Sequence, residues 1–259
     1  MLTIHNIVII GSGNVASHLA WAFKNAGLLV SGIYSRHFEN AQQLAAKIDV
    51  KAFRTMQDIP LDADAYLYAV KDIALPEVLR NSPDFKGILM HTSGTVGLDV
   101  FEDRFKRAAV FYPLQTFTKD KAVDFSAIPL LIESKNKKDL KLIEDLGKKL
   151  SANIQITNSE QRKQIHLAAV FASNFSNYMY YIAQELLQEK GLDFNLLKPL
   201  IHETVDKINT LSPAESQTGP AKRKDFDTLN KQLEMLKENP AYQNIYHLIS
   251  EQIQKLNSK

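Results

Sequence analysis

Six residues near the amino terminus combine small side chains in an order that suits a bound diphosphate. They directly follow the apolar run 7–10 and are Gly11, Ser12, Gly13, Asn14, Val15 and Ala16. Gly11 permits a tight turn, Gly13 lets the backbone approach a phosphate, and Ala16 lets a helix pack closely on a strand. The first turn of that helix would offer free N–H groups to the anion. The segment predicts a dinucleotide site; an empty glycine turn and a methyltransferase loop are the alternatives.

The end of the next apolar run indicates which dinucleotide is bound. An enzyme that uses NAD carries Asp or Glu there to hold the ribose hydroxyl, but this chain has Ser35 and Arg36. A hydroxyl and a guanidinium suit a 2'-phosphate, because arginine offers several donors and a fixed charge. The cofactor expected is therefore NADP. A solvated arginine at a strand end is the alternative reading of Arg36.

The ends of two later apolar runs provide further candidate positions for cofactor binding. Ligands lie beyond the carboxyl ends of the strands in a doubly wound sheet, so these positions are expected to flank the nicotinamide. They are Val70, Lys71, Thr92 and Ser93. His91, in the same position, could donate a proton or orient a carbonyl. A hydrogen-bonded structural histidine is the alternative.

The carboxyl-terminal half adds further polar candidates. On a regular helix over residues 160–190, His166, Ser173 and Asn177 share one narrow stripe, with Asn174 beside it. A substrate could satisfy this stripe, or interhelical hydrogen bonds could. Arg223 follows a Gly-Pro turn and could grip a carboxylate or a phosphate. Alternatively, this segment only begins a helix that Asp225 caps.

Positioning these residues requires alternating strands and helices in the first part of the chain. Short apolar runs occupy residues 7–10, 30–34, 65–70, 88–90 and 109–112, and a helix over 15–26 is expected to end at Gly27. A strand over 129–132, a helix over 138–150 and an apolar alternation at Ile154 and Ile156 close this part. The pattern predicts an α/β Rossmann domain, with a mostly parallel doubly wound sheet, over residues 1–157.

Only helices are expected after residue 157. The spacing predicts helices over 160–190, 195–211, 226–237 and 241–256, with an irregular loop over 211–224 that contains two Pro turns. Residues 158–259 would therefore form an all-helical domain for substrate binding and dimerisation. An apolar stripe on the last helix favours a homodimer, and burial within one chain is the alternative. The stripe comprises Tyr242, Ile245, Ile249, Ile253 and Leu256.

Composition favours small-molecule chemistry. The formal net charge of +2 is too small for a nucleic-acid footprint, and 45% hydrophobic residues suffice for a core. No segment has the roughly 18 apolar residues of a membrane span. The chain lacks cysteine, which excludes thiolate zinc sites and is compatible with the cytoplasm. The seven histidines are dispersed, so no metal site is expected.

Five segments resemble the motifs of one bacterial group of NADP oxidoreductases that join a Rossmann-like domain to a carboxyl-terminal domain of uncharacterised function. They are residues 11–16, 91–94, 112–117, 166–174 and 218–225. The resemblance spans nearly the whole chain. It implies the superfamily of 6-phosphogluconate dehydrogenase, 3-hydroxy acid dehydrogenases and pyrroline-5-carboxylate reductase, with an all-helical second domain that often dimerises.

One departure from this superfamily bears on mechanism. In the 3-hydroxy acid dehydrogenases a catalytic lysine precedes the asparagine by one helical turn, and Val170 stands at that position here. His166 or Lys71 could replace it. The expected function is hydride transfer between NADP(H) and a small carbonyl, hydroxy acid or imine, with His91, His166, Asn174 and Arg223 at the reacting centre. The alternative is a protein that senses NADP without turnover.

Overall fold

The computed structural model describes residues 3–119 and 121–256 and divides into two compact units, Met1–Asn174 and Phe175–Lys259. The secondary structure changes from α/β to helical after Ile156, whereas the units divide after Asn174. The first helix of the helical part therefore belongs to the first unit. A domain boundary at 157/158 stays a prediction.

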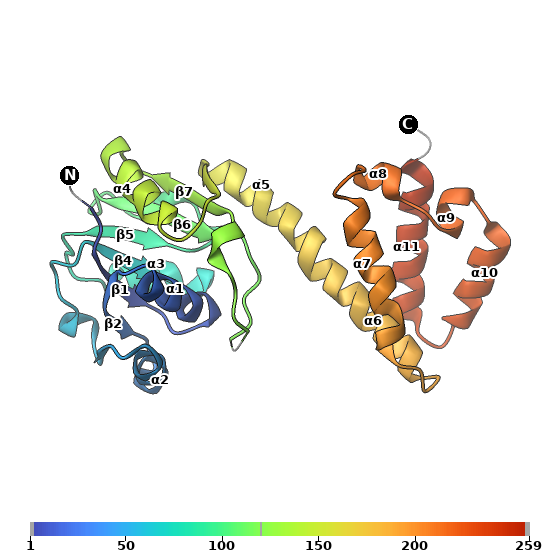
Figure 1. Ribbon diagram of the computed structural model, residues 1–259, viewed down its shortest axis with the longest axis horizontal. Coiled ribbons are helices and arrows are strands. Elements are labelled where there is room, and N and C mark those ends of the chain that lie inside the picture. The colour runs from blue at the N-terminus through green and yellow to red at the C-terminus, as the bar shows by residue number, and fades with distance from the viewer. Residues whose placement is uncertain (1–2, 120, 257–259) are drawn as a thin grey trace. The chain divides into compact units, whose positions relative to one another are not determined.

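The first unit contains an eight-stranded sheet in the order β3-β2-β1-β4-β5-β6-β7-β8 (Figure 1). All neighbouring strands are parallel except β6 and β7, which are antiparallel. This arrangement confirms the mostly parallel Rossmann fold. The strands are β1 (Asn6–Ile10), β2 (Leu29–Tyr34), β3 (Ala52–Phe53), β4 (Ala65–Tyr68), β5 (Ile88–His91), β6 (Ala108–Pro113), β7 (Leu130–Ser134) and β8 (Ile154–Ile156).

Side chains of each central strand alternate between two hydrophobic cores. Ile7 and Ile9 of β1 belong to one core, and Val8 and Ile10 belong to the other. This is the period of two that a strand buried on both faces requires. Three helices supply the first core and one supplies the second: α1 (Asn14–Asn25), α2 (Phe38–Ile48) and α4 (Lys137–Lys148) on one face, and α3 (Leu75–Arg80) on the other.

Three elements of this unit, β3, α2 and α3, were not predicted. Strand β3 has two residues, paired with Ile33 and Tyr34 of β2, which is too short to show a period in the sequence. The predicted end of α1 at Gly27 is confirmed, since this residue has a φ of 76° and Ala26 is the C-cap. The short 3-10 helices of the unit are η1 (Met56–Asp58), η2 (Asp72–Ala74), η3 (Leu98–Val100) and η4 (Phe125–Ala127).

The helical run that begins after β8 is not uniform. It consists of α5 (Ser159–Ala169), a π-helical segment (Val170–Phe175) and α6 (Ser176–Gln188). A π-helix bonds residue i to i+5, so it shifts the angular position of every side chain that follows. The single regular helix assumed for the stripe of His166, Ser173 and Asn177 therefore holds only as far as Ala169.

The second unit is helical, as expected. After α6 come η6 (Phe194–Leu197), α7 (Lys198–Lys207), α8 (Pro213–Ser216), α9 (Pro220–Arg223), α10 (Phe226–Met235) and α11 (Pro240–Leu256) (Figure 1). The expected irregular loop over 211–224 was wrong in detail, because it contains the one-turn helices α8 and α9. Pro213 and Pro220 each stand in the first turn, where proline's missing N–H removes no helical bond. No helix among the described residues is long and apolar enough to cross a membrane.

Candidate functional site

The turn after β1 has the geometry of a diphosphate cradle. Gly11 has a φ of 132°, and a Cβ there would lie 2.1 Å from the Ala69 carbonyl oxygen, so only glycine fits. A Cβ at Gly13 would meet nothing within 4 Å, which leaves space for a ligand against the backbone. The first backbone bond of α1 runs from the Ser17 N–H to the Gly13 carbonyl, over 2.9 Å. The N–H groups just before Ser17 therefore remain available to an anion.

The end of β2 lies beside this turn and carries the groups expected for a 2'-phosphate. The Ser12 hydroxyl donates a hydrogen bond to the Ser35 hydroxyl over 2.9 Å. Arg36 is exposed and pairs with no carboxylate in the part of the chain that the structure describes. An exposed guanidinium at the residue after Ser35 fits the extra phosphate of NADP. The residues present thus fit the nucleotide predicted from them.

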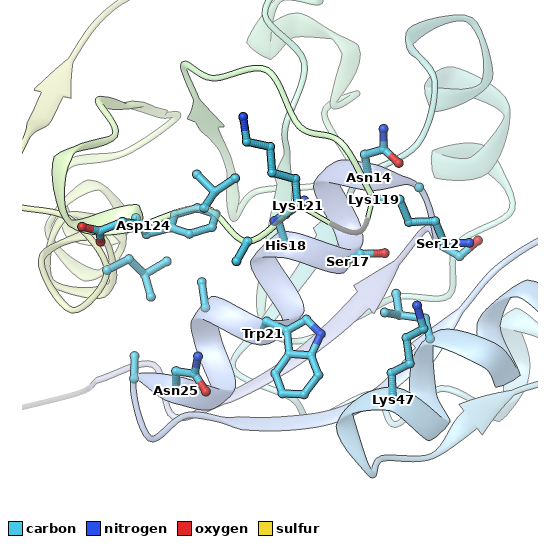
Figure 2. A pocket seen from close by; sticks show the side chains of 18 of the residues that line it. Ser12, Asn14, Ser17, His18, Trp21, Asn25, Lys47, Lys119, Lys121 and Asp124 are labelled. Atoms are coloured by element: carbon cyan, nitrogen blue, oxygen red, sulfur yellow. The ribbon is translucent and has the colours of Figure 1, made fainter.

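The segment that follows β6 is tied to the beginning of α1. The Asn14 side-chain amide donates to the Phe117 carbonyl over 2.8 Å, and His18 Nε2 bonds to the Thr118 carbonyl over 2.9 Å. Asn14 and His18 of α1 line a cavity of ≈ 1390 Å³ together with Lys119 and Lys121, and Figure 2 shows the four side chains. The Asn14 side chain is therefore engaged by protein, and a bound anion would meet the backbone N–H groups of this helix end instead.

A second group of polar residues gathers at the carboxyl ends of β5 and β6. Tyr112 Oη, at the end of β6, lies 2.9 Å from Nδ1 of His166 on α5. A Cβ added to Gly94 would lie 2.5 Å from the same Nδ1, so the turn after β5 packs directly against the imidazole. Burial raises the pKa of Tyr112, and the negative charge of Asp72 adds to this effect.

His91 lies in the protein interior rather than in an open cleft. Its exposed fraction is 0%, its ring stacks on Phe101 with centroids 5.5 Å apart, and its Nδ1 accepts a hydrogen bond from the Ser93 N–H. Burial, with a smaller effect from the charge of Arg162, lowers its pKa to about 3. His91 is consequently neutral at physiological pH and holds the turn of residues 92–94 in place.

The other residues expected near the nicotinamide are placed around the same edge of the sheet. The Ser93 hydroxyl accepts hydrogen bonds from the N–H groups of Thr95 and Val96, and the Thr95 hydroxyl donates to Asp72. Thr92 and Val70 are partly exposed, and Lys71 is exposed. Ser93 thus shapes the turn through its side chain.

A buried ion pair at this edge was missed by the sequence reasoning. Arg162 has an exposed fraction of 0% and pairs with Glu133 of β7, and its guanidinium also donates to the Val96 carbonyl. The Ser159 hydroxyl donates to Glu133 over 2.9 Å. Arg162 precedes His166 by four residues, a spacing that places both on one helix face. This four-residue spacing was the sequence feature that could have linked Arg162 to the site of His166.

Two candidates remain, Asn174 and Arg223. Asn174 is exposed within the π-helical segment of the first unit, and Arg223 is exposed in α9 of the second unit. Asp225 accepts a hydrogen bond from the Thr228 N–H over 3.1 Å and is the N-cap of α10. The capping role considered for Asp225 is therefore confirmed, while the roles of Asn174 and Arg223 stay predictions.

Comparison with known proteins identifies the family. Residues 6–90 match a family model described as NADP oxidoreductase coenzyme F420-dependent, and residues 128–253 match a domain of unknown function, DUF2520. A crystal structure from Bacteroides fragilis, described as the "putative NADP oxidoreductase BF3122", is 37% identical with a TM-score of 0.90, covering 97% of this chain and 98% of that one. The chain belongs to this NADP oxidoreductase family. The predicted cofactor, NADP, is confirmed by that membership.

More distant structures share the fold. Protein TM1727 from Thermotoga maritima is 22% identical, with a TM-score of 0.72, covering 96% of this chain and 97% of that one. An imine reductase from Myxococcus stipitatus in complex with NADP+ is 13% identical, with a TM-score of 0.70, covering 98% of this chain and 94% of that one. No curated protein sequence matches the chain.

Proposed function

We propose that this oxidoreductase transfers a hydride between NADP(H) and a small carbonyl, hydroxy acid or imine. The observation that carries the proposal is the placement of two groups of residues at the carboxyl edge of one sheet. Gly11, Gly13 and Arg36 would hold the nucleotide at β1 and β2, and Tyr112 and His166 lie at the end of β6 and on α5. Ligands of doubly wound sheets lie along this edge.

The candidate residues divide by what each can touch. His166 is partly exposed and polar, so it is proposed to take part in the proton transfer that accompanies reduction of the carbon–oxygen or carbon–nitrogen bond. His91 is proposed as a positioning residue for the 92–94 turn, because a fully buried neutral ring cannot reach a substrate. Asn174 and Arg223 are exposed and are proposed to orient the substrate and to hold its acidic group.

A second copy of the chain is proposed to complete the helical unit. Among the described residues from 175 onward, only Ala221, Leu229 and Leu236 are buried. Leu200 on α7 remains 63% exposed and Met235 at the end of α10 remains 79% exposed. Helices with so little buried apolar surface need a partner, and a two-fold homodimer is the commonest assembly. The stripe on α11 lines an apolar groove of ≈ 370 Å³ with α6.

Cofactor binding and turnover test this function directly. The protein should quench or enhance NADPH fluorescence on binding and should oxidise NADPH in the presence of at least one small ketone, keto acid or cyclic imine. The variant Arg36→Ala should weaken NADPH binding by about 10- to 100-fold and leave NADH binding unchanged, because one charge-assisted contact is lost. The variant Arg80→Ala, on α3, is the matched control.

Two outcomes would count against the proposal. Absence of affinity for both nicotinamide coenzymes would remove it altogether. Tight NADPH binding without oxidation across the substrate panel would instead favour the alternative, a protein that senses NADP without turnover.

A further inference from the structure

Tyr112 and His166 form a contact that joins the end of β6 to helix α5. The phenol oxygen lies 2.9 Å from Nδ1, and the two rings meet edge to face with centroids 5.9 Å apart and an interplanar angle of 69°. Both side chains are partly exposed. A phenol and an imidazole both exchange protons readily, so the contact can carry a proton.

Gly94 holds the imidazole in this position. An added Cβ would lie 2.5 Å from Nδ1 and 2.7 Å from Cγ of His166. The backbone of Gly94 has no left-handed φ, so the ring rather than the chain conformation requires glycine here. Three separate segments therefore converge on one hydrogen bond, which is more than a chance contact at the surface would show.

The electrostatic surroundings keep the phenol protonated. Burial raises the pKa of Tyr112, the negative charge of Asp72 raises it further, and the positive charge of Arg162 opposes them. From the neighbouring strands, Glu133 of β7 is engaged with Arg162, and His91 of β5 is neutral. A neutral, partly exposed phenol at the carboxyl edge of the sheet is a general acid that can act at neutral pH.

We propose that Tyr112 donates the proton taken up by the substrate's oxygen or nitrogen, and that His166 returns a proton to Tyr112. The inference rests on the proposed function and names the acid that this function needs. A phenol has a single hydrogen, so Tyr112 can donate to the substrate only while its oxygen accepts from an Nδ1–H group of His166. The proposal therefore also requires the Nδ1–H tautomer of that imidazole.

The reaction balances in this arrangement. Bound NADPH would supply a hydride, which is two electrons and a proton, to the carbon of the C=O or C=N bond. The π electrons move to the oxygen or nitrogen, which takes the proton of Tyr112. Nε2 of His166 takes a proton from solvent as the phenolate oxygen takes the Nδ1 proton, and exchange with solvent then restores the Nδ1–H tautomer. Oxidation follows the same path in reverse.

Steady-state kinetics test the proton donor. NADPH oxidation would be measured with cyclohexanone, with cyclohexanone plus methylamine, and with 1-pyrroline as probes. Tyr112→Phe should lower kcat by about 10²- to 10⁴-fold with little change in KM, the range expected for general acid catalysis. The pH profile of kcat for Tyr112→Phe should lack the limb that reports ionisation of the general acid. Tyr66→Phe, which removes a buried hydroxyl bonded to the Pro60 carbonyl, is the matched control.

Displacing the imidazole through Gly94 gives an independent variant. Gly94→Ala should place a methyl group where His166 packs and should lower kcat as much as His166→Asn does. The double variant Gly94→Ala with His166→Asn should have a kcat no lower than that of His166→Asn alone, because both changes remove the same interaction. His5→Asn, at an exposed histidine before β1, should leave kcat unchanged.

Nitrogen-15 NMR of the imidazole gives a readout that needs no turnover. In the protein with and without NADPH, His166 should show the Nδ1–H tautomer and should lose this preference in Tyr112→Phe. A wild-type protein that turns over a probe while Tyr112→Phe keeps its kcat and pH profile would overturn the inference and leave the proposed function intact. An Nε2–H tautomer of His166 in the wild type would also overturn it. Failure of the wild type to oxidise NADPH with any probe would remove the proposed function and the inference together.

Discussion

His91 shows at the scale of one residue how burial changes what a side chain can do. The folded protein holds its pKa at about 3, mainly through burial, against 6.5 in an unfolded chain. Between these values the unfolded chain binds a proton that the folded protein does not. Above pH 6.5 the neutral His91 costs the folded protein no stability relative to the unfolded chain. As the pH falls from 6.5 toward 3, protonation of the unfolded chain lowers the free energy of unfolding.

This difference makes a measurable prediction. The free energy of unfolding of the wild type should fall by about 1.4 kcal/mol per pH unit from this residue alone as the pH is lowered through the window. In His91→Asn the slope should be shallower by about this amount, since the amide oxygen can accept from Ser93 without titrating. Urea unfolding at several pH values measures it, with His5→Asn as control. Equal slopes in the wild type and His91→Asn would contradict the assignment.

At the scale of elements, the Arg162–Glu133 pair fixes where α5 begins against β7. The guanidinium is fully buried and the carboxylate is 15% exposed, so each charge depends on the other for its compensation. The geometry of this ion pair also sets the position of His166, one turn further along α5. The element that carries the proposed acid–base pair is thus anchored by charge as well as by packing.

Breaking this pair should be costly. Glu133→Gln leaves the buried guanidinium without its counter-charge and should lower the free energy of unfolding by about 3–5 kcal/mol. The double variant Arg162→Met with Glu133→Gln should recover part of that loss, because the uncompensated charge is gone. Denaturant titration measures both. For the exposed pair of Lys163 and Glu160, Glu160→Gln should change stability by at most about 1 kcal/mol, and a similar value for Glu133→Gln would contradict the argument.

At the scale of the whole molecule, the exposed apolar side chains of the helical unit argue for assembly. We expect a homodimer in solution at micromolar concentration, measured by light scattering over a dilution series. Leu200→Glu should shift the equilibrium toward monomer, because a charge would enter the proposed interface at α7. Leu61→Glu introduces the same charge at an exposed leucine of the first unit and should not shift it. A monomer at all concentrations would remove dimerisation from the proposal.

The sequence by itself was sufficient for features set by local backbone and by periodicity. The turn at Gly11 and Gly13 and the alternation of strands and helices were readable, because each depends on neighbours along the chain. The two-residue β3 and the one-turn α8 and α9 were missed, since elements of that length show no period.

Only the tertiary structure decided which side chains meet. The sequence pointed to His91 and His166 alike. In the structure His91 is fully buried, whereas His166 is partly exposed and contacts Tyr112. Tyr112 and His166 lie 54 residues apart along the chain. Such contacts depend on how β5, β6 and α5 pack together, and no property of a short segment determines that packing.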